Sequence, residues 1–246
     1  MMKAVILAAG VGSRLKELTK NIPKCLLNLN NSTTILDFQI STLIKFADLD
    51  YSDIFVVGGY KFESLKYLED KGINLIFNPK YKDWNNIYSF YLIKENVSNN
   101  FYLLNGDTIY HPDILKNLVN TDSNTYFVVD NVKILGKEEM KVLIKNNRIL
   151  KFGKNIQSRE SDGEYIGVAK FNKNDAKVIF NKIEDLINEE ETGIWYELAI
   201  NKVLDKIIAK PIYTNRLLWI EIDTKEDYKK AKEIFKFNDC INFPLK

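Results

Sequence analysis

Strand-like apolar runs alternate with helix-like patterns over roughly the first two-thirds of the chain, and this alternation limits the folds available to it. Short apolar runs of strand length occur at residues 3–7, 54–57, 75–77, 101–104 and 126–129. Apolar residues with helical spacing occur between them, at residues 35–46, 62–68, 86–94 and 112–119. This β-α-β-α order predicts an α/β, doubly wound fold, in which helices cover both faces of a mostly parallel sheet.

The middle of the chain has a different pattern. Short strands joined by polar turns are expected at residues 141–144, 148–152 and 165–171. They predict a small antiparallel addition laid against the parallel core. Further helices are expected at residues 176–187, 196–204 and 226–235, and further strands at 207–212 and 218–222. A length of 246 residues favours a single domain over residues 1–236, followed by a tail at 237–246.

Composition excludes several classes of function. The 35 Lys and Arg nearly balance the 33 Asp and Glu, which argues against binding to nucleic acid or to an anionic membrane. No apolar run approaches a membrane span, and no signal-peptide pattern is present, so the cytoplasm is the expected location. Cys25 and Cys240 are too far apart in sequence for a zinc motif. His111 is the only histidine, which argues against a His-based catalytic triad.

A glycine-rich turn, Gly10-Val11-Gly12-Ser13-Arg14, follows the first predicted strand. Glycines allow backbone N–H groups to approach phosphate oxygens closely. The turn is neither a dinucleotide fingerprint, because Leu15 stands where a small residue is needed, nor a P-loop, because Gly-Lys-Ser/Thr is absent. Arg14 is one of only four arginines, and Lys24 follows closely. The two cations suit a polyphosphate, and the alternative for each is a solvated surface position.

Three segments resemble a known enzyme family. Leu7-Ala8-Ala9-Gly10-Val11-Gly12-Ser13-Arg14, continued by Pro23-Lys24, resembles the signature of nucleotidyltransferases that use a nucleoside triphosphate and release pyrophosphate. Residues 85–92 resemble a segment of the phosphocholine cytidylyltransferase branch. Residues 163–171 resemble cytidylyltransferases that act on phosphocholine-like and aminoalkylphosphonate substrates. The resemblance implies a Rossmann-like fold of the nucleotide-diphospho-sugar transferase type, with residues 133–215 forming the acceptor-binding part.

Two carboxylates are candidate metal ligands. Asp107 follows an apolar strand at the edge where open α/β sheets bind ligands. Asp223 follows a strand whose alternation places Trp219, Glu221 and Asp223 on one face. Each aspartate could instead cap a following helix. The resemblance favours Asp107 and Asp223 as ligands of Mg²⁺, with Glu221 as an additional ligand and Mn²⁺ as an alternative ion.

The resemblance also implies an activity. CMP would pass from CTP to the phosphate or phosphonate of a small amine-bearing acceptor, with release of pyrophosphate, for cell-surface polysaccharide or lipid modification. The nucleophile is already ionised, so no general base is needed. Arg14 and Lys24 would be the catalytic residues. The expected nucleotide-binding residues are Leu7, Ala8, Ala9, Gly10, Gly12, Ser13, Gly59, Tyr60, Asn85, Asn86 and Ser89.

The acceptor site is expected around Trp195-Tyr196-Glu197, since aromatic faces and a carboxylate suit a cationic amine. The alternative is that these aromatic rings belong to the core. Lys141 and Glu164 complete the acceptor residues that the resemblance implies. Two other functions stay open: a sugar-1-phosphate or inositol-phosphate nucleotidylyltransferase, and a nucleotide-binding module without turnover.

Overall fold

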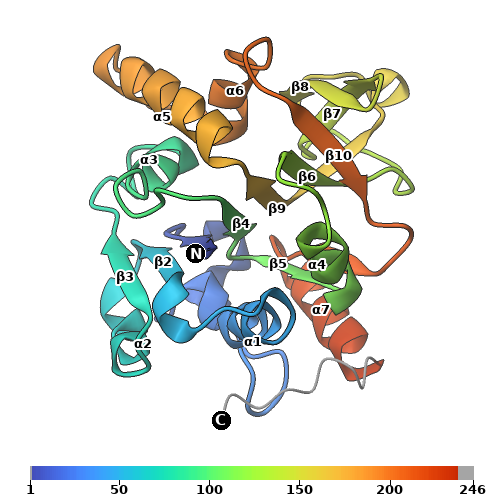
Figure 1. The fold of residues 1–246 in the computed structure, drawn as a ribbon. Coiled ribbons are helices and arrows are strands. Elements are labelled where there is room, and N and C mark those ends of the chain that lie inside the picture. Colours follow the sequence, from blue (N-terminus) through green and yellow to red (C-terminus); the bar gives the residue numbers. More distant parts are fainter. Residues whose placement is uncertain (1, 238–246) are drawn as a thin grey trace.

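The computed structural model describes residues 2–237 and confirms the predicted α/β fold (Figure 1). The strands of the main sheet follow the order β10-β6-β9-β4-β1-β2-β3. Their bounds are β1 (Lys3–Ala8), β2 (Ile54–Gly58), β3 (Asn74–Phe77), β4 (Phe101–Asn105), β6 (Thr125–Asp130), β9 (Gly163–Phe171) and β10 (Ala209–Tyr213). Residues 238–246, which make up nearly all of the predicted tail, lie outside the described part of the chain.

The antiparallel part is more deeply integrated than the sequence predicts. Strands β1, β2, β3 and β4 pair in parallel, as do β6 and β10. Strand β9 lies between β4 and β6 and runs antiparallel to both. Only β7 (Lys141–Lys145) and β8 (Arg148–Gly153) lie off this path. All nine residues of β9 are buried, which explains why it occupies the middle of the sheet rather than an edge.

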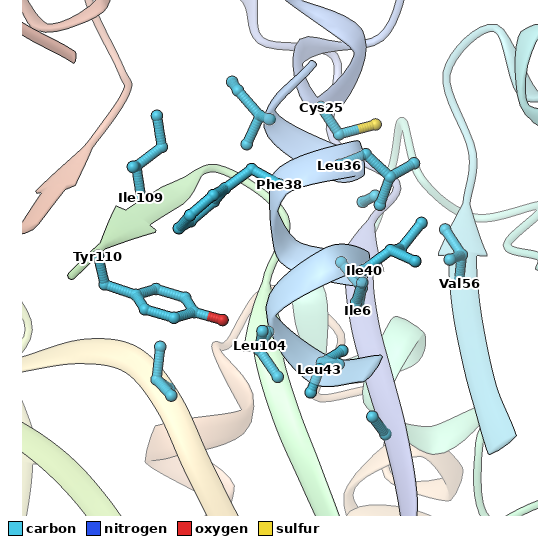
Figure 2. Close-up of a cluster of buried hydrophobic side chains, with 14 of the residues drawn as sticks. Ile6, Cys25, Leu36, Phe38, Ile40, Leu43, Val56, Leu104, Ile109 and Tyr110 are labelled. Carbon is cyan, nitrogen blue, oxygen red and sulfur yellow. The ribbon is translucent and has the colours of Figure 1, made fainter. Parts of the chain in front are cut away.

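Helices cover both faces of the sheet. One hydrophobic core contains side chains from α1 (Ile35–Ala47), α2 (Tyr67–Asp70), α4 (Pro112–Val119) and α7 (Lys225–Phe237). The other contains side chains from α3 (Asn86–Tyr91), α5 (Lys173–Asn188) and α6 (Tyr196–Asn201). Figure 2 shows the first core, where Phe38 of α1 packs edge-on against Tyr110. Alternate residues of β1 enter opposite cores, as the pleat of a strand requires.

Several predicted elements are shorter in the structure. The expected helix at 62–68 is a 3-10 turn (Phe62–Leu65) followed by the single turn of α2, and α3 ends at Tyr91. One small sheet was not predicted: β5 (Thr108–Tyr110) pairs with β11 (Trp219–Glu221) in antiparallel fashion. This pairing brings residues near 108 and 221 side by side. Within residues 2–237, no helix combines the length and apolar character needed to cross a membrane.

Gly167 sits at an irregularity in β9 that shapes the edge of the sheet near the cavity described below. The register between β6 and β9 shifts at this point, which marks a β-bulge. Gly167 has φ +77°, and a Cβ atom there would lie 2.5 Å from Nδ2 of Asn105. Glycine therefore allows both the left-handed backbone and the close approach of the Asn105 side chain.

We expect Gly167→Ala to lower the free energy of unfolding by about 1–3 kcal/mol, because alanine at this φ is strained and meets Asn105. Urea unfolding followed by circular dichroism measures the change. Gly193→Ala is the matched control, because no atom lies within 4 Å of the added Cβ. Equal stability of the two variants would show that the bulge imposes no requirement for glycine.

Candidate active site

One large cavity, of about 1060 Å³, lies at the carboxyl ends of β1 and β4. This is the edge where open α/β sheets bind ligands. Its lining includes the residues that follow β1, those that follow β4, and the segment around β11. All three tryptophans of the chain, Trp84, Trp195 and Trp219, also line it.

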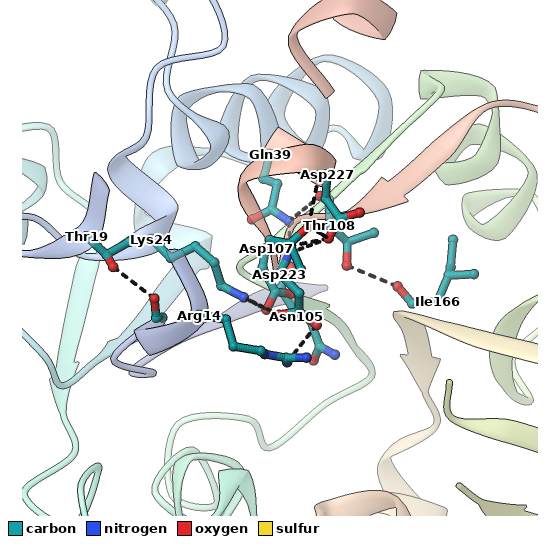
Figure 3. A network of polar contacts seen from close by, with 12 residues as sticks. Arg14, Thr19, Lys24, Gln39, Asn105, Asp107, Thr108, Ile166, Asp223 and Asp227 are labelled. Atoms are coloured by element: carbon teal, nitrogen blue, oxygen red, sulfur yellow. Dashed lines mark hydrogen bonds and ion pairs between the residues drawn. The ribbon is translucent and has the colours of Figure 1, made fainter. Parts of the chain in front are cut away.

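The glycine-rich turn forms one wall of the cavity. Gly12 has φ +65°, and a Cβ atom there would lie 3.2 Å from Cγ2 of Thr19. The buried Thr19 hydroxyl donates to the Gly12 carbonyl at 2.9 Å (Figure 3). The turn is thus held in its shape by a contact from the end of the following 3-10 segment (Ser13–Thr19). Leu7, Ala8, Ala9, Gly10, Gly12 and Ser13, which were predicted to bind the nucleotide, all line the cavity.

Arg14 and Lys24 meet the two predicted metal ligands. Lys24 Nζ lies 2.7 Å from Oδ2 of Asp107 and 2.9 Å from Oδ1 of Asp223. Arg14 lies 2.8 Å from the other oxygen of Asp223 (Figure 3). Burial alone would lower the pKa of Lys24, but the two carboxylates raise it well above its usual value. Lys24 is therefore a permanent cation at this site.

Asp107, Glu221 and Asp223 form a compact carboxylate cluster. One oxygen from each lies within 4.8 Å of the others. The pairing of β5 with β11 explains how residues more than a hundred positions apart converge. Oδ1 of Asp107 is buried and has no hydrogen-bond partner. An orphaned carboxylate oxygen beside two further carboxylates fits a hard divalent cation such as Mg²⁺.

Helix capping does not account for either aspartate. Strand β5, not a helix, follows Asp107, and His111 caps α4 by accepting from the Asp113 amide at 3.2 Å. The start of α7 is capped by Thr224, whose hydroxyl accepts from the Asp227 amide at 3.2 Å. Both aspartate side chains are therefore free to face the cavity.

Gln39 holds the loop that carries Asp107, a contact that the sequence does not reveal. Its buried amide group donates to the carbonyls of Asn105 and Thr108, at 2.8 and 2.9 Å (Figure 3). The Asp107 carbonyl accepts from the Ile222 amide at 3.0 Å. The loop is thus fixed on both sides of its carboxylate.

Three of the five remaining residues predicted to bind the nucleotide line the cavity, and two do not. Asn85 caps α3 and Ser89 accepts a hydrogen bond from Asn78 at 2.8 Å; both line the cavity together with Asn86. Gly59 and Tyr60 do not line it. Tyr60 donates from its hydroxyl to the Lys20 carbonyl at 2.6 Å.

The Gly59 position has a packing role instead. A Cβ atom there would lie 2.5 Å from Cβ of Tyr81 and 2.8 Å from the Ala9 carbonyl oxygen. Glycine is required for this close approach, and the contact of Gly59 with the nucleotide stays a prediction.

The predicted acceptor residues separate into two groups. Trp195, Glu197 and Glu164 line the cavity. Tyr196 does not: its ring is fully buried and stacks on Phe90, with centroids 5.1 Å apart. The ring of Tyr196 therefore belongs to the hydrophobic core, which was the alternative interpretation, because the first turn of α6 directs this side chain inward.

Lys141 is also absent from the cavity wall. Its side chain is 1% exposed, and Nζ donates to the carbonyls of Glu139 and Lys154, at 3.4 and 3.0 Å. The ammonium group therefore faces backbone carbonyls in this structure and not the cavity, and the direct contact of Lys141 with an acceptor stays a prediction.

Sequence reasoning missed several residues of the cavity wall. Trp84 adjoins the segment 85–92, and Trp219 lies on the same face of its predicted strand as Glu221 and Asp223; the rarity of tryptophan in this chain was an available signal that both belong to the site. Lys133 and Lys154 also line the cavity. Nothing in the sequence separated them from the other lysines.

Comparison with known proteins gives the family. The model of the MobA-like NTP transferase domain matches residues 4–137, which is more than half of the chain. The chain belongs to this family. A choline-phosphate cytidylyltransferase of Streptococcus pneumoniae is 31% identical, over 96% of this chain and 99% of that protein. A CTP:phosphoglutamine cytidylyltransferase of Campylobacter jejuni is 34% identical, over 69% of this chain and 73% of that protein.

A solved structure agrees with these relatives. The CTP:phosphocholine cytidylyltransferase of Streptococcus pneumoniae superposes with a TM-score of 0.80 and 26% identity, over 95% of this chain and 99% of that one. The protein is thus a nucleotidyltransferase with the nucleotide-diphospho-sugar transferase fold.

Glu197 of this NTP transferase is an unusual carboxyl group. It is 3% exposed, and its Oε2 atom has no hydrogen-bond partner although Glu197 lines the cavity. Burial raises its pKa to about 7. The group is therefore only partly ionised at neutral pH, and a cationic ligand would favour its charged form.

We expect Glu197→Gln to stabilise the NTP transferase at alkaline pH. Below pH 4.5, the ordinary pKa of glutamate, Glu197 is protonated in both the folded and the unfolded protein, and its burial does not lower the free energy of unfolding. Between pH 4.5 and about 7 the carboxyl group ionises only in the unfolded protein, so the free energy of unfolding of the wild type falls. Above this pH range, the free energy of unfolding of Glu197→Gln should exceed that of the wild type by on the order of 3 kcal/mol. Urea unfolding at pH 4.5 and pH 8 measures it. The exposed Glu95→Gln is the control, and a Glu197→Gln gain independent of pH would contradict this assignment.

Proposed function

We propose that the protein is a Mg²⁺-dependent cytidylyltransferase. It transfers CMP from CTP to the phosphate or phosphonate of a small amine-bearing acceptor and releases pyrophosphate. One observation carries the proposal: a single cavity is lined both by Arg14, Lys24 and the carboxylate cluster and by Trp195 and Glu197. The names of the relatives support CTP as the donor and a phosphorylated amine compound as the acceptor.

The phosphate end explains how the donor would bind. Backbone amides of residues 10–13 and the planar fork of Arg14 would hold the β- and γ-phosphates. Lys24 would contact the α-phosphate and offset the charge that develops there. Asp107 and Asp223, with Glu221, would hold Mg²⁺, which when bound neutralises triphosphate charge.

The chemistry requires little of the protein beyond placement. An anionic oxygen of the acceptor forms a bond to the α-phosphorus in line, and the bond from this phosphorus to the bridging oxygen of the β-phosphate breaks. The electron pair leaves with pyrophosphate, and no proton needs to move. Positioning and charge neutralisation then provide the rate enhancement.

Asn85, Asn86 and Ser89 would shape the base and ribose site, because they line the cavity beside the glycine-rich turn. Residues 133–215 would form the acceptor-binding part, since Glu164, Trp195 and Glu197 come from this range. From the pattern of the sequence we infer a cytoplasmic enzyme, and from the resemblance we infer that its product serves cell-surface polysaccharide or lipid modification.

A pyrophosphate-release assay tests the proposal. The four common NTPs are combined with phosphocholine, 2-aminoethylphosphonate, phosphoglutamine, an inositol phosphate and a sugar 1-phosphate, in the presence of Mg²⁺. We expect release only with CTP and an amine-bearing acceptor. Preference for a sugar 1-phosphate or an inositol phosphate would replace the proposed acceptor class. Binding of CTP without any pyrophosphate release would indicate a nucleotide-binding module.

Asp107→Asn should lower kcat by at least about 100-fold, because removal of one electrostatic stabiliser costs about 3–4 kcal/mol in the transition state. Steady-state kinetics with Mg²⁺ measures the loss, and thermal unfolding verifies that the variant folds. Asp48→Asn is the control, since Asp48 is exposed and its left-handed backbone, φ 52°, tolerates asparagine. Near-normal turnover of Asp107→Asn would remove Asp107 from the metal site.

A further inference from the structure

Gln39 is a polar residue at a position where the fold provides an apolar environment. It lies in α1 and is 0% exposed, between the buried core residues Phe38 and Ile40 of the same helix. Burial of an amide group is unfavourable unless hydrogen bonds compensate for the lost water. An apolar side chain would fill this position equally well, so the contacts of the amide have to explain why a glutamine stands there.

Both hydrogens of the Gln39 amide are used on one turn. Nε2 donates to the carbonyl of Asn105 at 2.8 Å and to the carbonyl of Thr108 at 2.9 Å (Figure 3). These two carbonyls stand at the two ends of the β4–β5 turn (residues 105–108), and Asp107 lies inside it. A single side chain therefore clamps the turn across its ends.

The orientation of the amide follows from the turn and not from the surrounding core. Oε1 of Gln39 is buried and has no hydrogen-bond partner in the part of the chain that the structure describes. An inverted amide would place this oxygen against two carbonyl oxygens, which have no hydrogen to donate. An unpaired buried acceptor destabilises the fold. The two bonds to the turn are thus accompanied by an unfavourable term that an apolar residue would avoid.

The other contacts of the β4–β5 turn come from within it. The Gly106 amide donates to the Leu7 carbonyl at 2.8 Å, and the Thr108 hydroxyl donates to the Ile166 carbonyl at 3.2 Å. Of the described residues outside the turn, Gln39 is the one whose side chain donates to its carbonyls. Substitution of Gln39 can therefore loosen the turn while these other contacts remain.

The carboxylate on this turn belongs to the cluster that fits a divalent cation. Oδ1 of Asp107 is buried without a hydrogen-bond partner, and one oxygen each of Asp107, Glu221 and Asp223 lie within 4.8 Å of one another. The other two carboxylates come from the end of β11, so the position of the turn decides how Asp107 faces them. Mg²⁺ demands near-ideal ligand geometry, and a displaced turn would therefore weaken its binding.

We propose that Gln39 is a positioning residue for this metal site and sets the affinity of the protein for a divalent cation through Asp107. The inference rests on the proposed function, because it presumes that Asp107 binds Mg²⁺. Gln39 does not line the cavity, so it acts through the turn and not by contact with a substrate. Its two hydrogen bonds hold the backbone from which the Asp107 carboxylate extends, and such supporting contacts orient metal ligands.

Binding of Mn²⁺ to Gln39→Met tests this role. Methionine has nearly the length of glutamine but no donor. Bound Mn²⁺ is measured by electron paramagnetic resonance and by water-proton relaxation, with the protein alone and with CTP but no acceptor. We expect the Kd for Mn²⁺ to rise about 10- to 100-fold, as is typical when a group that orients a metal ligand is lost. The midpoint of thermal unfolding should stay within about 4 °C of the wild type, because the variant loses an unpaired acceptor along with two donors.

Steady-state kinetics gives a second measure. In Gln39→Met the Mg²⁺ concentration for half-maximal activity should rise about 10-fold or more, and excess Mg²⁺ should restore most of the kcat. The KM for the acceptor at saturating Mg²⁺ should change less than about twofold, because Gln39 does not line the cavity. A substitution that only destabilised the fold would reduce the amount of active protein without changing its Mg²⁺ requirement.

Thr42→Val is the matched control. Thr42 is also a fully buried polar residue of α1, and its hydroxyl donates to the Gln39 carbonyl at 2.8 Å and lies 3.2 Å from the Tyr110 hydroxyl. Neither bond reaches the β4–β5 turn, so the Kd for Mn²⁺ should equal that of the wild type. Equal weakening in Thr42→Val, or an unchanged Kd in Gln39→Met, would overturn the proposal.

If Gln39→Met does not fold, Gln39→Asn provides the same comparison, because its amide is one methylene too short to span both carbonyls. The measurements also separate this inference from the proposed function. Mn²⁺ binding and pyrophosphate release by the wild type, with an unchanged Kd in the variant, would contradict only the role of Gln39. Mn²⁺ binding without pyrophosphate release would contradict the proposed reaction alone. Absence of Mn²⁺ binding by the wild type, with and without CTP, would overturn this inference together with the metal site.

Discussion

The geometry of the site depends on one cation held between two carboxylates. Lys24 contacts Asp107 and Asp223, and these three residues come from the start, middle and end of the chain. Carboxylates this close repel one another, and fixed positive charge beside them offsets this repulsion. Lys24 and Arg14 supply that charge, and both are suited to phosphate. Under the proposed function, Lys24 and Arg14 would form ion pairs with the carboxylates before the nucleotide binds, and they would contact its phosphates afterwards.

The sheet explains why chemically different groups line one cavity. The parallel strands β1 and β4 deliver the glycine-rich turn and Asp107 to one edge, as their carboxyl ends must. Strand β9 runs in the opposite direction between β4 and β6, and β7 pairs with its amino-terminal end. Glu164, near the start of β9, therefore reaches the same edge as Asp107 near the end of β4. A reversed central strand thus brings Glu164, a predicted acceptor residue, to the edge that carries the glycine-rich turn and Asp107.

Local patterns in the sequence were sufficient for the fold class and for most of the phosphate end. The period of apolar residues predicted the α/β fold, and strand ends placed Asp107 and Asp223 at the ligand-binding edge. Local patterns failed where burial decides the outcome. Lys141 and Tyr196 carry suitable chemical groups, but long-range packing directs both inward. Lys154 gave no signal, because its contact with the ring of Trp195 forms only in the folded chain.

The charges at the acceptor end set conditions on what can bind there. Glu197 has an unpartnered buried oxygen, and Lys154 has only an exposed, weakly held partner. Under the proposed function, the cationic amine of an acceptor would supply a counter-charge to Glu197. A sugar phosphate would leave Glu197 without a counter-charge, and sites reject ligands that leave buried polar groups unpaired. Discrimination between acceptors would then arise from the cost of ionising Glu197 more than from the face of Trp195. Aromatic surface alone would not distinguish the acceptor classes.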